Sequence, residues 1–139
     1  RAQIGTTRMK ALLPAGWPRP KGYSNGVSAS GRTIVTAGVI GWNASEIFEA
    51  TDLPGQFRQA LANILDILAE DQAGPEHIVR MTCFVTDIDE YRSNLAGIGD
   101  AWRETIGRHF PAMAVVAVTA LVEPNARIEI EATAIVPEP

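Results

Sequence analysis

Residues 110–136 read FPAMAVVAVTALVEPNARIEIEATAIV and contain two strand patterns, one on each side of a turn at Glu123-Pro124. Residues 112–118 are almost wholly apolar, as in a strand that is covered on both faces. Residues 127–136 alternate, so their apolar side chains share one face while three polar ones, Glu129, Glu131 and Thr133, share the other. The pattern therefore predicts two strands, of which only the second has a polar face.

The residues before these strands predict an irregular start, a hairpin and a helix. Residues 1–22 are interrupted by prolines and glycines and are expected to be irregular. Residues 23–29 and 32–40 are rich in strand-forming residues and are expected to pair as a hairpin. Residues 54–72 carry a continuous apolar stripe at helical spacing, with Asp52 placed to cap the helix.

A second strand and a second helix complete the chain. Residues 77–86 predict a strand whose buried face is formed by Val79, Met81, Cys83 and Val85. Residues 87–106 predict one helix that begins at a capping box made by Asp87 and Glu90. Its apolar stripe consists of Tyr91, Leu95, Ile98 and Trp102.

The order of these elements, β-β-α-β-α-β-β, predicts an α+β fold in which two helices cover one face of a single sheet. Residues 1–139 are expected to form a single domain. The strand at 112–118 is apolar on both faces, although the helices cover only one. We therefore expect another copy of the chain to cover the second face, which would place the polar face of residues 127–136 in a cleft between subunits.

Composition limits the classes of function. The chain has 139 residues and a formal net charge of −4, without a basic run that would indicate binding to nucleic acid or to an anionic membrane. No apolar run is long enough to span a membrane. The single cysteine, Cys83, rules out an internal disulfide and fits a cytoplasmic location. His77 and His109 lack the spacing of zinc ligands, so no metal site is expected.

The residues alone leave the chemistry open. Glu129 and Glu131 are two residues apart on one strand face, so their Cα atoms are roughly 6.5–7 Å apart. They form either an ordinary solvated face or carboxylates held in a cleft for proton transfer or water activation. Gly38, at the end of the strand at 32–40, indicates a bulge or a close approach to the backbone.

Several segments together resemble the Rid family, the reactive intermediate deaminases, also called the YjgF family. The resemblance is carried by Tyr23-Ser24-Asn25-Gly26, Ala37-Gly38, residues 59–63, Ile78-Val79-Arg80, Phe84-Val85-Thr86-Asp87, Phe110-Pro111-Ala112 and residues 128–132. It implies a chorismate-mutase-like fold with one mixed sheet, a homotrimer with clefts at the subunit interfaces, and no cofactor. It also implies hydrolysis of reactive enamines and imines to a keto acid and ammonia.

Position by position, the resemblance assigns roles to several residues. Tyr23 matches the cleft tyrosine of the family, Gly38 the glycine whose backbone faces the ligand, and Glu129 the glutamate that positions water. Two positions depart from the family's deaminases. Met113 stands where those enzymes carry the arginine that grips the substrate carboxylate, and Val115 stands where they carry a cysteine.

The missing arginine predicts a change of substrate. A thioether is only a weak acceptor, so a small 2-imino acid should bind poorly. Met113 and Val115, together with Trp42, are expected to form an apolar, adaptable pocket that suits a larger or an uncharged enamine. Arg80 or Arg127 could replace the missing cation. The alternative is a trimeric binding or regulatory module that has kept the cleft and lost the chemistry.

Overall fold

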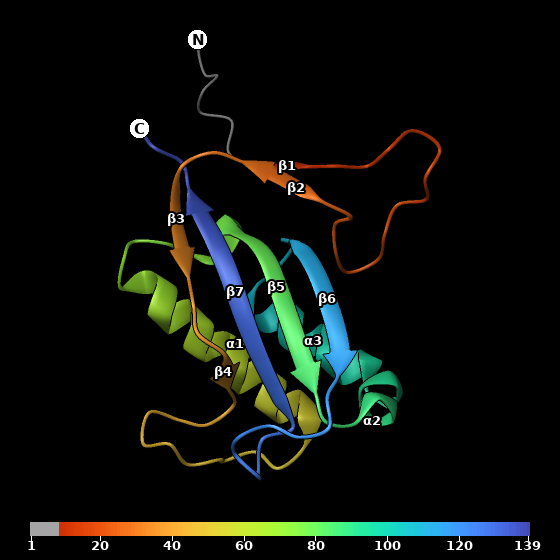
Figure 1. The fold of residues 1–139 in the computed structure, drawn as a ribbon, viewed down its shortest axis with the longest axis vertical. Coiled ribbons are helices and arrows are strands. Elements are labelled where there is room, and N and C mark those ends of the chain that lie inside the picture. Colours follow the sequence, from red (N-terminus) through yellow and green to blue (C-terminus); the bar gives the residue numbers. More distant parts are fainter. Residues whose placement is uncertain (1–8) are drawn as a thin grey trace.

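The computed structural model describes residues 9–139 and has two layers, a mixed sheet and a layer of helices (Figure 1). In chain order the elements are β1 (Met9–Ala11), β2 (Val27–Ala29), β3 (Arg32–Val35), β4 (Val39–Ile40), α1 (Leu53–Ala69), the short 3-10 helix η2 (Pro75–His77), β5 (Ile78–Val85), α2 (Ile88–Ser93), α3 (Leu95–Thr105), β6 (Ala112–Ala117) and β7 (Ile128–Val136).

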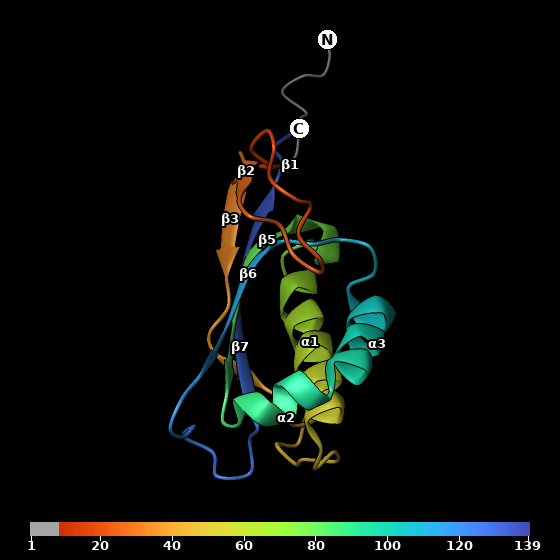
Figure 2. The same cartoon turned by 90° about the vertical axis from the view of Figure 1, so that its right-hand side faces the viewer.

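The main sheet has the strand order β3-β7-β5-β6, and β4 also pairs with β7. β5 and β6 are parallel, whereas β7 is antiparallel to β3, β4 and β5. Helices α1, α2 and α3 all lie on the same side of this sheet (Figure 2). The predicted α+β class and the mixed sheet are therefore confirmed. The two strands predicted from residues 110–136 are not neighbours, because β5 lies between them.

The hairpin predicted at residues 23–29 and 32–40 is wrong. β2 pairs with β1 in a separate two-stranded sheet, while β3 and β4 both pair with β7. Gly31 has a φ of +146° and lies against the backbone of Val136, so the chain turns there to enter the main sheet. The segment predicted to be irregular contains β1. Residues 12–22 form no helix or strand, and residues 1–8 lie outside the described part.

The helix after β5 is divided into α2 and α3. The side chain of Asp87 caps α2 by accepting hydrogen bonds from the N–H groups of Asp89 and Glu90, at 3.0 and 3.1 Å. The capping box is not completed, because the Glu90 carboxylate pairs with Arg127 instead. Asn94 then donates from its side chain to the Glu90 carbonyl at 2.7 Å and leaves the helical conformation. That local hydrogen bond competes with the helix and explains the break.

The core lies between the sheet and the helices. Met81, Cys83 and Val85 of β5 are buried there as predicted, but a bulge between residues 78 and 80 moves Val79 off this face. Cys83 is 1% exposed, and burial raises the pKa of its thiol to about 12. A thiol with so high a pKa remains protonated near neutral pH, so Cys83 contributes packing and no nucleophile.

The other face of the sheet carries no helix and exposes large apolar side chains. Val35 of β3 is 69% exposed and Val116 of β6 is 43% exposed. Such a face usually marks a contact surface, because apolar side chains gathered on a sheet favour burial against a partner. The predicted second copy of the chain has a suitable surface here, and the oligomeric state stays a prediction.

Candidate functional site

Glu129 lies on β7 directly opposite Ile40 of β4, and its carboxylate is packed against the backbone of Gly38. A Cβ atom at position 38 would overlap the Glu129 carboxylate, so glycine is required for this placement. Glu129 is half-buried, whereas Glu131, two residues further along β7, is exposed. The structure thus distinguishes the two glutamates, which strand alternation alone left equivalent.

Trp42 also belongs to the surroundings of Glu129. Asn63 on α1 donates to the carbonyls of Ile40 and Trp42, at 3.0 and 2.7 Å, and so fixes the chain just after β4. A cavity of about 540 Å³ at this edge of the sheet is lined by Gly38, Trp42 and Glu129 among others. We call it the Glu129 pocket.

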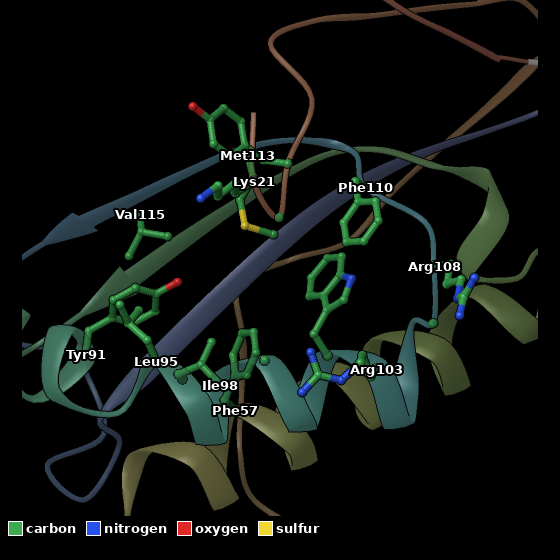
Figure 3. Close-up of a pocket in the computed structure, with 15 residues that line it drawn as sticks. Lys21, Phe57, Tyr91, Leu95, Ile98, Arg103, Arg108, Phe110, Met113 and Val115 are labelled. Carbon is green, nitrogen blue, oxygen red and sulfur yellow. The ribbon is translucent and has the colours of Figure 1, made fainter. Parts of the chain in front are cut away.

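The other predicted site residues lie in a second, larger cavity between β6 and α3, shown in Figure 3. This cavity has a volume of about 790 Å³, and we call it the Met113 pocket. Tyr23, Met113 and Val115 line it, together with residues that the sequence had assigned to a helix stripe. Within that stripe, Ile98 and Trp102 are buried as expected, whereas Leu95 is exposed in the pocket wall.

Tyr23 is held at this pocket by the residue that follows it. The N–H of Ser24 donates to the Pro111 carbonyl at 3.0 Å, and its hydroxyl donates to the Phe110 carbonyl at 2.5 Å. These bonds tie the segment that contains Tyr23 to the start of β6. Two parts of the chain that are far apart in sequence therefore form one wall of the pocket.

The two pockets share no lining residue in the described part of the chain. Met113 pairs with Met81 and faces the helices, whereas Glu129 pairs with Phe84 and belongs to the opposite face of the sheet. β4 and β6 also lie on opposite sides of the β7-β5 pair. Within one chain, the structure brings Gly38, Trp42 and Glu129 together but leaves them apart from the Met113 pocket.

Neither of the two arginines considered as a substitute cation lines either pocket. Arg127 donates to the Thr51 carbonyl at 2.6 Å and to the Glu90 carboxylate at 3.0 Å, while its N–H donates to the buried Gln56. Arg127 therefore holds the loop before β7 in place. Arg80 is exposed opposite Ala112 on the helix-free face.

Sequence reasoning missed four polar residues of the Met113 pocket: Lys21, Tyr91, Arg103 and Arg108. Lys21 lies two residues before Tyr23, and Arg108 follows the glycine that ends α3. These positions, next to a predicted site residue and a predicted helix end, were the signal by which the two cations could have been found. Burial, and secondarily the neighbouring Cys83, raise the pKa of Tyr91. Tyr91 is therefore a neutral hydrogen-bonding group in the pocket wall near neutral pH.

Residues 9–139 contain neither a cluster of metal-ligating side chains nor a helix suited to a membrane. No three His, Cys, Asp or Glu side chains in this range come together as a metal site. None of the helices in it combines the length and the apolar character needed to cross a membrane.

Comparison with known families decides the relationship. The family model described as Endoribonuclease L-PSP matches residues 18–136. The chain belongs to this family, the YjgF/Rid family. The Rid resemblance seen in the sequence is thereby confirmed, while the consequence of the missing arginine stays a prediction.

Individual Rid relatives agree with this. The human protein named 2-iminobutanoate/2-iminopropanoate deaminase is 31% identical over 114 residues, which are 81% of this chain and 79% of the human one. The Rid family protein YyfB of Yersinia pestis, whose function is described as unknown, has a TM-score of 0.82 and 32% identity, over 94% of this chain and all of that one. The YjgF protein of Escherichia coli has a TM-score of 0.67 and 30% identity, over 91% and 98% of the two chains.

Proposed function

We propose that this protein hydrolyses a reactive enamine or imine to a carbonyl compound and ammonia. The observation that carries the proposal is the half-buried Glu129 carboxylate, which is packed against Gly38 inside an open cavity. A carboxylate in this setting can orient a water molecule and accept its proton. The relationship to a protein named 2-iminobutanoate/2-iminopropanoate deaminase supports the same class of reaction.

The proposed reaction uses water as the nucleophile. The oxygen of a water held by Glu129 attacks the carbon of the protonated C=N bond, and the water proton passes to the carboxylate. That proton then moves to the nitrogen of the carbinolamine, and the C–N bond breaks as ammonia leaves. The hydroxyl group gives up its proton to the carboxylate as the C=O bond forms, and this proton passes on to ammonia, which leaves as ammonium. An enamine enters the same sequence after protonation of its carbon converts it to the imine. The carboxylate is restored at the end of each cycle.

The complete site requires two copies of the chain in this proposal. The Glu129 pocket lies toward the β4 edge of the sheet and the Met113 pocket at the β6 edge, so a head-to-tail contact between copies would bring the two pockets together. Head-to-tail contacts close into a ring when the rotation between copies allows it, and the family resemblance favours a ring of three copies. The exposed Val35 and Val116 on the helix-free face support burial against a partner.

We expect light scattering to give about three times 14.9 kDa, as a closed three-membered ring requires.

Mixing two impaired variants tests whether the site is shared between copies. Glu129→Gln and Tyr23→Ala proteins should each lose most of their activity, whereas co-expression should restore part of it, because some interfaces then pair an intact Tyr23 with an intact Glu129. A monomer, or a mixture as inactive as its parents, would show that the site lies within one chain.

The proposed function itself is tested by ammonia release. Enamines and imines generated in place by amino-acid oxidases or dehydratases form the substrate panel, and ammonia is followed with and without the protein. At least one compound should be hydrolysed faster than its spontaneous rate, and Glu129→Gln should abolish the difference. A panel of small, large, charged and neutral compounds on which the protein never exceeds the spontaneous rate would contradict the proposal.

One observation favours a second function, a trimeric module that binds a small molecule without converting it. Met113 replaces the arginine that the resemblance places at this position, so the pocket can bind without gripping a substrate carboxylate there. A binding module would bind compounds in calorimetry yet release no ammonia from any of them. Catalysis that depends on Glu129 would exclude it.

A further inference from the structure

The Met113 pocket is positively charged although the chain as a whole is acidic. Three cationic side chains line it, Lys21, Arg103 and Arg108, and no Asp or Glu among the described residues does. The whole chain has a formal net charge of −4, so a purely cationic lining differs from the average surface. A concave surface lined by charges of one sign raises the local concentration of ligands of the opposite sign.

Two of these cations are available to a ligand. Arg103 is engaged by Asp100 at 2.5 Å. Within the described part of the chain, Lys21 and Arg108 form no ion pair with an acidic side chain. Figure 3 places Lys21 on the strand side of the pocket, near Met113, while Arg103 lies on the side of α3. Both Lys21 and Arg108 are exposed, and Figure 3 places them at opposite ends of the pocket, with Phe110 between them.

Below these cations the wall is apolar and largely aromatic. Phe57 and Trp102 are buried with their rings stacked at a centroid distance of 6.4 Å, and Leu95 and Val115 add aliphatic surface. The Trp102 N–H is occupied, because it donates to the His109 carbonyl at 3.1 Å. The volume of about 790 Å³ lies in the range of roughly 300–1,000 Å³ typical of pockets for drug-sized ligands. A three- or four-carbon acid would leave most of it empty.

We propose that the Met113 pocket selects a ligand with an aromatic body and a carboxylate that is held by the exposed Lys21. The aromatic group lies against Trp102, Met113 and Val115. A substrate with these features is an aryl-substituted 2-imino acid, and the claim that the protein converts it rests on the proposed function. The cation that the resemblance places on β6 is thus replaced by one on the segment before Tyr23.

Calorimetry with three matched probes tests the selection: 3-phenylpropanoate, its neutral amide 3-phenylpropanamide, and propanoate. The acid should bind about 5–10-fold more tightly than the amide, the usual range for a few partly exposed charge pairs, and the preference should shrink at high salt. Propanoate should bind about 10–100-fold more weakly than 3-phenylpropanoate, because burying an aromatic ring contributes roughly 1.5–3 kcal/mol.

The chain offers a matched control for Lys21, because its only other lysine, Lys10, lies exposed on β1 outside the pocket. Lys21→Gln should weaken binding of 3-phenylpropanoate about 3–10-fold and leave the amide unaffected. Lys10→Gln should change neither affinity. Arg108→Gln, at the opposite end of the pocket, should change this affinity little, and Arg92→Gln, on the exposed face of α2, should not change it.

Equal affinity for acid and amide, equal losses from Lys21→Gln and Lys10→Gln, or no binding of 3-phenylpropanoate would each overturn this inference. Ammonia release from the imine made by oxidation of phenylalanine distinguishes a failure of this inference from a failure of the proposed function. Selective binding without ammonia release from any imine would uphold the ligand class and reject the hydrolase. Ammonia release only from neutral enamines would uphold the hydrolase and reject the ligand class.

Discussion

Glu129→Gln should lower turnover of the enamine or imine substrate by about 10²–10⁴-fold, the usual contribution of a positioned acid or base. The amide keeps the shape of the carboxylate and still fits against Gly38, but it cannot accept the proton of the attacking water. Ammonia release under single-turnover conditions measures the chemical step. Thermal unfolding and light scattering should be unchanged, because Glu129 is only half-buried and the amide fills the same space.

Glu131→Gln is the matched control for this prediction. Glu131 lies on the same face of β7, two residues away, but is exposed and does not contact Gly38. It should retain most of the activity. Equal losses from the two variants would mean that the two carboxylates act as one functional unit. Full activity in Glu129→Gln would remove this residue from the mechanism and leave the binding module as the better explanation.

Local sequence patterns predicted most of the elements. The side chain of Asp52 accepts from the Gly55 N–H at 3.3 Å and starts α1 at residue 53, because a cap is decided by neighbouring residues. The alternation in β7 identified its buried face for the same reason. The pairing of β2 with β1 could not be predicted, because strand pairing depends on contacts between residues distant in sequence. The break at Asn94 depends on one side-chain hydrogen bond that the helical pattern did not reveal.

The candidate site was predicted residue by residue but not as an arrangement. Gly38 was expected to mark a bulge or a close approach to the backbone, and the Glu129 carboxylate lies against it. Local patterns did not indicate that Met113 and Glu129 lie on opposite faces of the sheet, because that depends on the register of β5 with both β6 and β7. Lys21 was overlooked because a lone lysine in a proline-rich segment is normally a solvated surface residue.

Met113→Arg should create activity on the small imine derived from 2-aminoacrylate, about 10–100-fold above wild type, since each 1.4 kcal/mol of added binding is tenfold. Met113 is partly buried against the core and its side chain enters the pocket. An arginine stem can follow the same apolar wall and place its guanidinium toward the mouth, where it can grip a carboxylate with two hydrogen bonds. Wild type should be weak on this imine, because a small acid gains little from the aromatic wall.

Met113→Leu is the control, because it conserves volume and adds no charge, so it should change activity on small and large imines little. Circular dichroism and the unfolding midpoint establish that each variant is folded. If wild type already hydrolyses the small imine rapidly, a cation other than residue 113 grips the carboxylate, and combining Met113→Arg with Lys21→Gln identifies it. If a folded Met113→Arg protein gains nothing, a guanidinium at this position does not hold the substrate carboxylate where the C=N carbon can react. The pocket then differs from that of the family's deaminases at more positions than residue 113. In that case activity should be sought on aromatic imines.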